Sequence, residues 1–311
     1  MRVFHGLNDF VKIENAVVTS GTFDGVHFGH QQILARLKEI TTAMEGENVV
    51  ITFWPHPRFV LSGMDIDLKL ISTLDEKIER LSDFGVDNLL IIPFDKQFAS
   101  LSSLEFIQKV LVDTVQTKKL VMGYDHRFGH NREGGFDFLM KNAYNFGFEV
   151  EEIPRQEVEE IAVSSTKIRR ALQHSDVQTA AKYLGRPYQL RGEVVGGAKL
   201  GRKLGFPTAN LLIKETYKLI PENGIYAVKA FHNDIAYDAM LNIGVRPTIA
   251  NEGERSIEVH LFDFNKDIYG ETLKIHFIDH LRNEKKFANL EELQHQLSID
   301  KEAALEVLNH F

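Results

Sequence analysis

Two histidines near the start of the chain, His27 and His30, lie in the segment Gly-Thr-Phe-Asp-Gly-Val-His-Phe-Gly-His at residues 21–30. Residues 16–20 have the length and β-branching of a buried strand, and the apolar residues that follow the segment recur at helical spacing. A strand-to-helix turn is therefore predicted. Backbone N–H groups and the helix dipole favour an anion at such a helix start, so the imidazoles predict a phosphate site. Taken alone, a His-x-x-His pair fits an ordinary helical turn equally well.

The other residues of this turn strengthen the phosphate interpretation. Glycines at three positions permit a close approach of the backbone to a ligand, and an acidic residue stands among them. We therefore expect phosphate contacts from Gly21, Phe23, Asp24, Gly25 and Gly29. A zinc site is disfavoured because no third ligand of suitable spacing stands nearby and the chain contains no cysteine.

Two further polar segments follow predicted strands, where the active site of a parallel sheet assembles. Residues 53–58, Phe-Trp-Pro-His-Pro-Arg, form a loop stiffened by prolines, for which a rigid turn and a direct ligand contact both stay open. Residues 123–129 carry a carboxylate, an imidazole and a guanidinium between two glycines. That mixture favours nucleotide or metal–phosphate contacts, with Asp125 and Arg127 as candidates.

A third segment, residues 163–170, combines helix-capping hydroxyls with cations that we expect in the first helical turn. Cations there oppose the helix dipole, and a bound phosphate would offset the conflict. A triphosphate site is therefore predicted, with a solvated basic face as the alternative. Its candidate residues are Ser164, Ser165, Thr166, Lys167 and Arg169.

The elements that must position these residues alternate between strand-like and helix-like patterns up to about residue 184. Strands are predicted at 16–20, 49–53, 89–92, 119–122 and 148–153, with helices between them, one of them capped by Asp75. Alternation of this kind predicts a parallel sheet with helices on both faces, in a Rossmann-like α/β domain. The absence of G-x-G-x-x-G after the first strand counts against an NAD enzyme.

The periodicity changes after Gly185-Arg186-Pro187, which ends a helix-like segment. Short strands separated by glycine, asparagine and proline follow, and helical spacing returns at residues 290–308. This half is predicted to be an antiparallel β-barrel with a C-terminal helix. We therefore expect two domains, residues 1–187 and residues 188–311.

The second half contains its own candidate site. Residues 196–205 hold four glycines and three cations, which suits a backbone cradle for phosphate. Thr208 and Asn210 would present hard oxygens on one strand face, as Mg²⁺ prefers, although Asn210 could also be a strand-end cap. Glu258 alternates with apolar residues on a half-buried strand, where an exposed carboxylate on the wet face is the alternative.

Composition bounds the possible functions. The 311 residues are 43% hydrophobic, with a formal net charge of −8 and no basic run, so a nucleic-acid partner is not expected. The N-terminus lacks the apolar core of a signal peptide, and the longest apolar runs have only strand length. With no cysteine, the chain fits a reducing compartment. We expect a soluble cytoplasmic protein without a membrane partner.

The first half resembles known enzymes at the motifs just described. His27-Phe28-Gly29-His30 is similar to the H-x-G-H signature of nucleotidylyltransferases. Together with F-W-P-H-P, G-Y-D-H-R-F-G and S-S-T-K-I-R, it resembles the adenylyltransferase half of bacterial bifunctional FAD synthetases. The resemblance implies that the two histidines stabilise the α-phosphate of ATP and the leaving pyrophosphate. Candidate flavin contacts in this half are Phe53, His56, Pro57 and Arg58.

The second half resembles riboflavin kinase almost throughout, at segments such as G-R-K-L-G-F-P-T-A-N-L, N-I-G-V-R-P-T and I-E-V-H-L-F-D-F. The resemblance implies that Glu258 accepts the proton of the ribityl 5′-hydroxyl and that Thr208 and Asn210 hold Mg-nucleotide. Kinase phosphate contacts are expected from Gly196, Lys199, Gly201, Arg202, Gly205 and Pro207, and flavin contacts from Arg282, Glu284 and Phe287.

Two chemistries are therefore predicted for one chain. The kinase needs a base because a hydroxyl is a poor nucleophile. Transfer of AMP to FMN needs cations and hydrogen-bond donors, because the FMN phosphate is already an anion. The expected ligands are riboflavin, FMN, FAD, ATP, ADP and pyrophosphate, with Mg²⁺ as cofactor. A single-activity nucleotidylyltransferase with an accessory barrel and a flavin-binding regulator are the alternatives.

Overall fold

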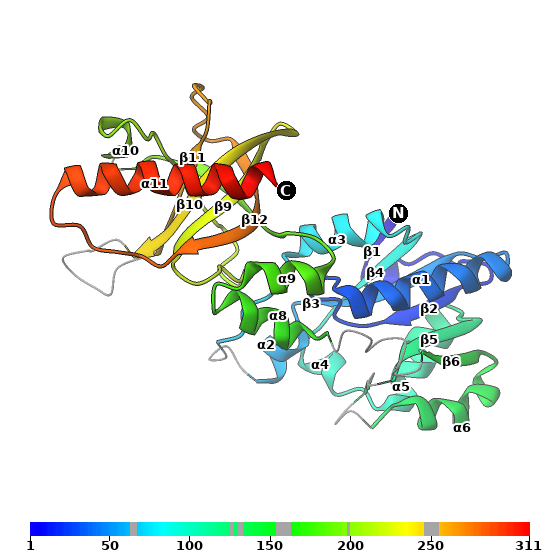
Figure 1. Ribbon diagram of the computed structural model, residues 1–311. Helices are drawn as coiled ribbons and strands as arrows, with labels where there is room; N and C mark the ends of the chain where they lie inside the picture. Colours follow the sequence, from blue (N-terminus) through cyan, green and yellow to red (C-terminus); the bar gives the residue numbers. More distant parts are fainter. Residues whose placement is uncertain (63–66, 125–126, 130–132, 154–162, 198–199, 246–254) are drawn as a thin grey trace. The chain divides into compact units, whose positions relative to one another are not determined.

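The polypeptide divides into two units, Met1–Ser165 and Thr166–Phe311, each built around its own sheet (Figure 1). The computed structural model describes residues 1–62, 67–124, 127–129, 133–153, 163–197, 200–245 and 255–311. Among these residues, no helix combines the length and the apolar character that crossing a membrane requires.

The first unit contains a six-stranded parallel sheet in the order β1-β4-β3-β2-β5-β6. Its strands are β1 (Arg2–His5), β2 (Val17–Ser20), β3 (Asn48–Trp54), β4 (Asn88–Pro93), β5 (Lys119–Gly123) and β6 (Glu149–Ile153). The helices of this unit are α1 (Phe28–Ala43), α2 (Pro57–Leu61), α3 (Leu74–Asp83), α4 (Lys96–Ala99), α5 (Ser103–Phe106), α6 (Phe136–Phe146), the short η1 (Leu7–Asp9) and the π-helical η2 (Ile107–Thr114).

Both faces of this sheet are covered by helices, as the alternating pattern predicts. Val17 packs in one apolar cluster with Leu34 and Leu37 of α1, whereas its neighbour Val18 packs in another with Ile107 of η2. Successive strand residues point to opposite faces, so a sheet buried on both sides needs apolar residues at consecutive positions. The α/β fold class expected for this half is confirmed.

Two details of the first unit differ from the sequence expectation. The edge strand β1 was not predicted, because only Val3 and Phe4 mark it as apolar and the pairing with β4 provides the rest. Helix α3 is capped by Thr73 rather than Asp75, since the Thr73 side chain accepts a hydrogen bond from the backbone N–H of Glu76, and the Glu76 carboxylate accepts one from the backbone N–H of Thr73. Asp75 lies in the first turn instead.

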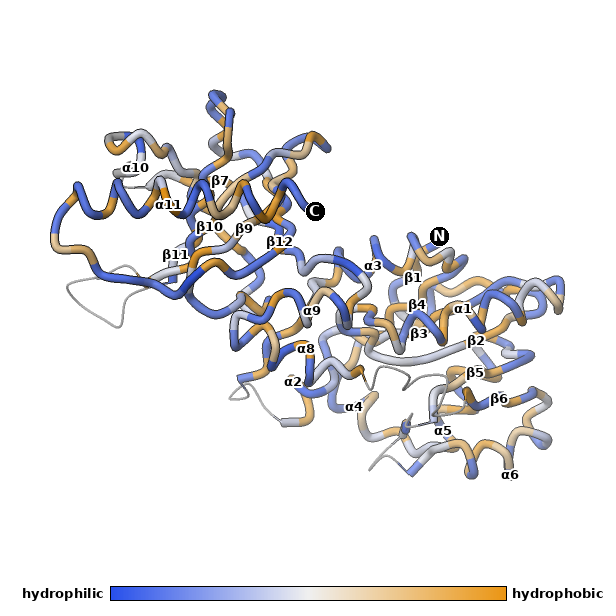
Figure 2. The backbone as a smooth tube through the Cα atoms, in the orientation of Figure 1, coloured by the Kyte–Doolittle hydropathy of each residue, from blue (hydrophilic) through white to orange (hydrophobic). Residues whose placement is uncertain are grey.

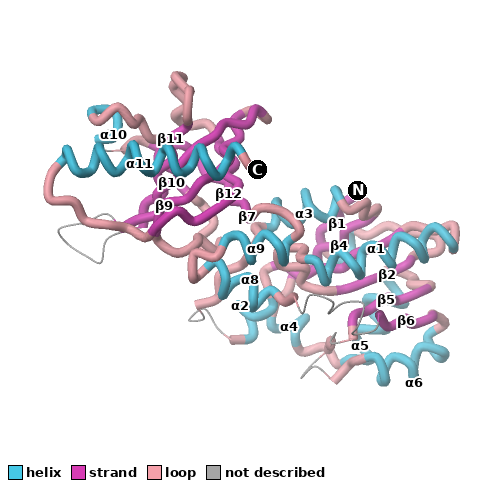
Figure 3. The backbone as a smooth tube through the Cα atoms, viewed as in Figure 1, coloured by secondary structure: helices cyan, strands magenta, loops and turns pink. Residues whose placement is uncertain are grey.

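The second unit contains the strands of an antiparallel barrel (Figure 3). The barrel is closed, and its strand order is β10-β11-β8-β7-β12-β9. Its strands are β7 (Tyr188–Val195), β8 (Ala209–Leu212), β9 (Gly224–His232), β10 (Ile235–Val245), β11 (Arg255–Leu261) and β12 (Thr272–Arg282). The helices are α8 (Ser165–Leu172), which begins at the last residue of the first unit, α9 (Val177–Leu184), α10 (Leu200–Lys203) and α11 (Leu290–Asn309). The predicted barrel with a C-terminal helix is confirmed.

Helix α11 lies across the outside of the barrel. Hydrophobic and hydrophilic residues alternate along it (Figure 2), and its residues Ala304 and Leu308 pack against Ala227 of β9 and Met240 of β10. Met240 therefore points away from the barrel interior, and residues two positions further along β10 share its face. This outer face carries the second site.

The chain between the sheets belongs largely to the second unit. Helix α9 packs on β7 and β12, and the backbone N–H of Glu222 donates a hydrogen bond to the carbonyl of Leu172 in α8. The boundary at residue 187 stays a prediction, which the truncations described below address.

Candidate active sites

The histidine-bearing turn follows β2, which lies between β3 and β5 in the sheet. The chain runs from β2 outward through β3 to β4, and then returns to the other side of β2 as β5. The carboxyl end of β2 is therefore the point where the strand order reverses, and ligands of open α/β sheets bind there. Helix α1 begins at Phe28, directly after the turn, so the predicted strand–turn–helix is confirmed.

The turn between β2 and α1 has a strained backbone. Phe23 and Val26 have φ angles of 47° and 43°, in the left-handed region that β-branched and bulky residues rarely adopt. Gly25 has a φ of 83°, and a Cβ there would lie 2.8 Å from Cγ2 of Ile71. Strain of this kind persists only where the surroundings hold it, and it gathers at functional sites.

The two histidines stack on each other, with ring centroids 3.7 Å apart and ring planes 17° from parallel. Burial lowers the pKa of His30 well below its ordinary value of 6.5, and the charges of His27 and Lys77 lower it further. At pH 7 His30 is therefore a neutral imidazole, which donates one hydrogen bond but carries no charge. The predicted role of His30 as a hydrogen-bond donor to phosphate does not require this charge.

Asp24 anchors the turn to the segment before α3. Its carboxylate, 2% exposed, accepts hydrogen bonds from the backbone N–H groups of Ile71 at 3.0 Å and Ser72 at 3.2 Å. The Ser72 hydroxyl in turn accepts a hydrogen bond from the N–H of Gly25 at 3.0 Å. The phosphate contact expected of Asp24 stays a prediction, and in the structure its oxygens accept hydrogen bonds from two backbone N–H groups and from the Ser72 hydroxyl. Asp24 therefore acts on the site by holding the turn.

Lys77 of α3 was missed by the sequence reasoning although it is 3% exposed beside this turn. Its ammonium lies 3.5 Å from the hydroxyl of Thr52 and 5.9 Å from the ring centroid of Trp54. Burial lowers the pKa of Lys77 from 10.5 to about 8, and the Asp24 carboxylate opposes that change. In the sequence Lys77 reads as one of several charged residues of an amphipathic helix, so no local signal marks it.

Several residues of the loop after β3 make capping or packing contacts within the fold. The Nδ1 atom of buried His56 accepts a hydrogen bond from the backbone N–H of Arg58 at 3.2 Å and so caps α2, while Pro57 is its first residue. Phe53 packs against the apolar cluster under the sheet, and Arg58 is exposed. Of the second loop, Arg127 is exposed, and Asp125 lies outside the described residues.

The segment at the start of α8 joins the site through Ser165, whose hydroxyl donates a hydrogen bond to the carbonyl of Asp24 at 3.2 Å. Lys167 is the third residue of α8, but Arg169 lies in its last turn, where the helix dipole favours a cation. The predicted conflict with the dipole therefore holds for Lys167 alone. With Arg170 and His174, Lys167 lines an open cavity of about 260 Å³ in the second unit.

The second site begins with a row of polar side chains across three barrel strands. Glu258 of β11 pairs in register with Asn210 of β8 on one side and Asn242 of β10 on the other. Residues in register share a face of the sheet, so the carboxylate stands between two amides. The hydroxyl of Thr208 donates a hydrogen bond to Oε2 of Glu258 at 3.3 Å. Asn242 was missed because its position depends on strand pairing.

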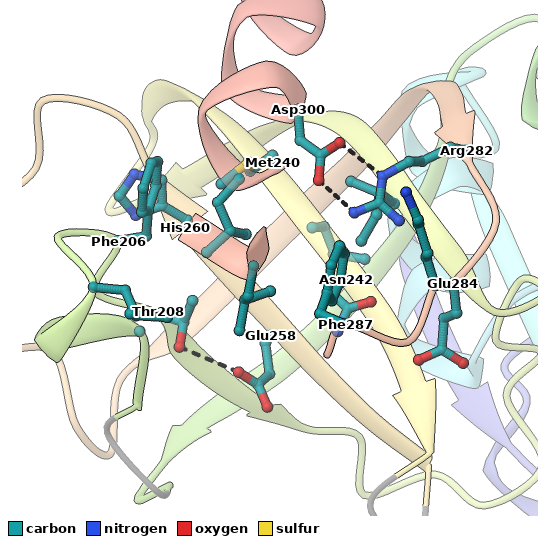
Figure 4. A pocket seen from close by; sticks show the side chains of 17 residues that line it. Phe206, Thr208, Met240, Asn242, Glu258, His260, Arg282, Glu284, Phe287 and Asp300 are labelled. Atoms are coloured by element: carbon teal, nitrogen blue, oxygen red, sulfur yellow. Dashed lines mark hydrogen bonds and ion pairs between the residues drawn. The ribbon is translucent and has the colours of Figure 1, made fainter. Parts of the chain in front are cut away.

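A cavity of about 280 Å³ opens beside this row, between the outer face of the barrel and α11 (Figure 4). Thr208 and Glu258 lie at one end of it, and Arg282, Glu284 and Phe287 line another part. The three predicted flavin residues are therefore brought together with the predicted base. The remaining lining residues include Phe206, Met240, Leu293 and Leu297.

An ion pair fixes the guanidinium that lines this cavity. Arg282 donates from Nε to Oδ1 of Asp300 at 2.7 Å and from Nη2 to Oδ2 at 2.5 Å. Asp300 is 3% exposed, and Gln296 donates a further hydrogen bond to its Oδ1 at 3.0 Å. Two parallel hydrogen bonds set both the position and the plane of the guanidinium, which lies 6.0 Å from the ring centroid of Phe287.

A second cavity, of about 500 Å³, shares Thr208 with the first. Arg202 and Pro207 line it, together with residues 264–269 after β11, which were not among the predicted site residues. Gly197 lies against Asn210, because a Cβ at that glycine would stand 2.1 Å from Nδ2 of the asparagine. Gly196 and Gly205 are exposed, Gly201 lines the first cavity, and Lys199 lies outside the described residues.

His260 ties the segment before β8 to β11. Its Nδ1 lies 2.8 Å from the carbonyl oxygen of Pro207, an acceptor, so this nitrogen carries the proton. Burial lowers the pKa of His260, the hydrogen bond to Pro207 raises it, and Lys301 of α11 lowers it. The bond holds Pro207, and with it Thr208, opposite Glu258.

Comparison with known proteins assigns both halves of the chain to families. A family model described as FAD synthetase matches residues 10–167, and one described as riboflavin kinase matches residues 184–308. Proteins named bifunctional riboflavin kinase/FMN adenylyltransferase match nearly the whole chain. The protein from Pseudomonas fluorescens is 38% identical and covers 98% of this chain and 97% of its own. The protein from Escherichia coli K12 is 35% identical and covers 98% of this chain and 97% of its own.

A solved structure is similar over nearly the whole chain. The crystal structure of a macrolide-efflux protein from Streptococcus pneumoniae is 33% identical, covers 98% of this chain and 99% of its own, and superposes with a TM-score of 0.88. The Bacillus subtilis protein named bifunctional riboflavin kinase/FMN adenylyltransferase is 37% identical over 95% of this chain and 94% of its own.

Proposed function

The chain belongs to the bifunctional riboflavin kinase/FMN adenylyltransferase family, and from this we propose that it makes FMN and then FAD, with one active site in each unit. It phosphorylates riboflavin with ATP, and it transfers AMP from a second ATP to FMN. The observation that carries the assignment of sites is chemical. One unit holds a carboxylate between two amides beside a cavity, and the other holds stacked imidazoles on a strained turn.

In the kinase site we place riboflavin in the 280 Å³ cavity and ATP in the 500 Å³ cavity. The two cavities share Thr208, whose hydroxyl touches Glu258, so a ribityl hydroxyl and a γ-phosphate would meet there. Glu258 accepts the proton of the ribityl 5′-hydroxyl while the hydroxyl oxygen bonds to the γ-phosphorus of ATP and ADP leaves. The fixed guanidinium of Arg282, with Glu284 and Phe287, orients the flavin.

Magnesium is the proposed cofactor of this site. Thr208 and Asn210 supply hard oxygen donors next to Glu258, which suits Mg²⁺, an ion that takes its other ligands from phosphate and water. Nowhere in the described part of the chain do three or more His, Cys, Asp or Glu side chains gather into a metal cluster, so a dedicated protein cage is not part of the proposal. When bound, the ion would neutralise phosphate charge.

In the adenylyl-transfer site, an oxygen of the FMN phosphate attacks the α-phosphorus of ATP, the α–β bond breaks and pyrophosphate leaves. His27 and the neutral His30 donate hydrogen bonds to phosphate oxygens, with the glycines and backbone of the turn closing around them. Arg127 and Asp125 are proposed as further phosphate contacts of this site. Lys167 and Arg169, which lie at the start of the second unit, stay predicted triphosphate contacts. The proposed flavin contacts are Phe53, His56, Pro57 and Arg58. We place the enzyme in the cytoplasm, without membrane or nucleic-acid partners.

A product assay tests the proposal. Purified protein with riboflavin, ATP and Mg²⁺ is expected to form FMN and then FAD, and with FMN and ATP to form FAD and pyrophosphate. Formation of FAD from added FMN without any riboflavin phosphorylation would instead support a transferase with an accessory barrel. Binding of flavin without turnover in either reaction would support a regulator.

A further inference from the structure

Lys77 is a buried charge that the proposed chemistry does not use. It lies on α3 and is 3% exposed, whereas lysines almost never occupy such positions unless they are paired. Its environment holds its pKa at about 8, so at pH 7 the ammonium is still largely protonated inside the unit. Burying an ammonium costs folding free energy, so we expect a role of Lys77 other than packing.

Hydrogen bonds connect Lys77 to the turn that carries the histidines. Its ammonium donates to the hydroxyl of Thr52 at 3.5 Å, and that hydroxyl donates to the carbonyl of Thr22 at 3.4 Å. Thr52 is fully buried near the carboxyl end of β3, and Thr22 is the second residue of the turn. The ammonium therefore reaches the backbone of the turn through a single hydroxyl.

The charge of Lys77 also interacts with two side chains of this segment, Asp24 and His30. It attracts the carboxylate of Asp24, which holds the turn through the N–H groups of Ile71 and Ser72. It also repels a proton on His30, as does the stacked ring of His27. The groups that face His30 are thus His27 from the start of α1, Phe23 from the turn, at 5.0 Å between ring centroids, and Lys77 from α3.

We propose that Lys77 is a positioning residue for adenylyl transfer: its buried ammonium, linked through Thr52 to the backbone of the turn and attracted to Asp24, holds the turn in the geometry that presents the histidine pair. A neutral imidazole keeps one nitrogen as donor and the other as acceptor, so its hydrogen-bonding direction is defined. Two stacked imidazolium rings would repel each other and separate. The inference rests on the proposed role of His30 in transferring AMP to FMN.

The experiment compares Lys77→Met and Lys77→Arg with the parent enzyme in both half-reactions. Lys77→Met removes the charge at similar length, and Lys77→Arg retains it at every pH in use. Lys38→Met, an exposed lysine of α1, is the matched control. Rates of FAD formation from FMN and of riboflavin phosphorylation are measured across pH 5–10 on the full-length protein, with folding checked by circular dichroism.

Lys77→Met is expected to lower kcat for FAD formation by roughly tenfold to a hundredfold, the loss typical of a displaced reacting group. The acid limb of its pH–rate profile for FAD formation should move to higher pH, because the charge on α3 that opposes protonation of His30 is then absent. FMN ionisation is common to all variants and cannot produce that difference. In the parent enzyme FAD formation should fall above about pH 8, where Lys77 loses its proton. Lys77→Arg should abolish this alkaline loss. Riboflavin phosphorylation should not change in any variant.

The inference would be overturned if Lys77→Met forms FAD with the rate and pH profile of the parent while His30→Ala is strongly impaired. The proposed site would then stay intact. Normal FAD formation by His30→Ala would overturn the proposed site itself. If Lys77→Met does not fold, Lys77→Arg decides: an alkaline limb identical to that of the parent would count against Lys77, and its disappearance would support it.

Discussion

The charge of Lys77 should cost the first unit stability, and its removal should recover that cost. The pKa of Lys77 is about 8 in the folded chain and ordinarily 10.5, a difference that corresponds to about 3 kcal/mol at pH 7. The attraction to Asp24 is already contained in the lower value, because it opposes the effect of burial. Lys77→Met, which replaces the ammonium by an apolar group of similar length, should therefore raise the free energy of unfolding by about 3 kcal/mol at pH 7.

The pH dependence of this difference has a defined sign. Between pH 8 and 10.5 the unfolded lysine still binds a proton that the folded lysine has lost, so the parent gains stability as the pH rises. The advantage of Lys77→Met should therefore be complete below pH 8 and should vanish above pH 10.5. The same substitution is expected to impair FAD formation, so the charge would be retained for function at a cost in stability.

The single tryptophan of the chain provides the assay. Trp54 belongs to the first unit, and its ring lies 5.9 Å from the ammonium of Lys77, so its emission reports unfolding of that unit within the full-length protein. Urea titrations at pH 7 and pH 9.5 give the free energies of the parent and the variant. The control Lys38→Met, at an exposed position, should stay within about 0.5 kcal/mol. A destabilised Lys77→Met at pH 7, or a difference that does not depend on pH, would refute the reasoning.

The remaining predictions concern the two sites and the boundary. His27→Ala and His30→Ala should each reduce FAD formation by roughly a hundredfold, the usual loss for one transition-state donor, without affecting riboflavin phosphorylation; equal loss of both activities would make the histidines structural. Glu258→Gln should reduce riboflavin phosphorylation by a hundredfold to ten-thousandfold while FMN adenylylation and ATP binding persist, and near-normal FMN production would remove Glu258 from the mechanism. Fragments 166–311 and 188–311 should both make FMN, with a higher melting temperature for the longer one, because α9 packs on β7 and β12 and the end of α8 is hydrogen-bonded to Glu222. A folded but inert fragment would contradict the placement of the kinase.

Local patterns were enough to predict most of the elements, although not β1, and to nominate the candidate site residues. The run of β-branched residues before the glycines and the helical spacing after them predict the strand–turn–helix around His27 and His30. Alternation along residues 255–261 predicts the strand that carries Glu258. Both signals depend on neighbours within a few positions, because backbone periodicity is a local property.

The sequence by itself therefore determined the two fold classes, the family and the chemistry that each half can perform. Only the tertiary structure decided which side chains stand together. Asn242 joins Glu258 through strand register, and Asp300 fixes Arg282 from a helix 18 residues further along. Lys77 becomes a functional candidate only because Thr52 and Trp54 of β3 cover it. Burial, charge coupling and the resulting pKa values depend on residues distant in the chain, so no local pattern encodes them.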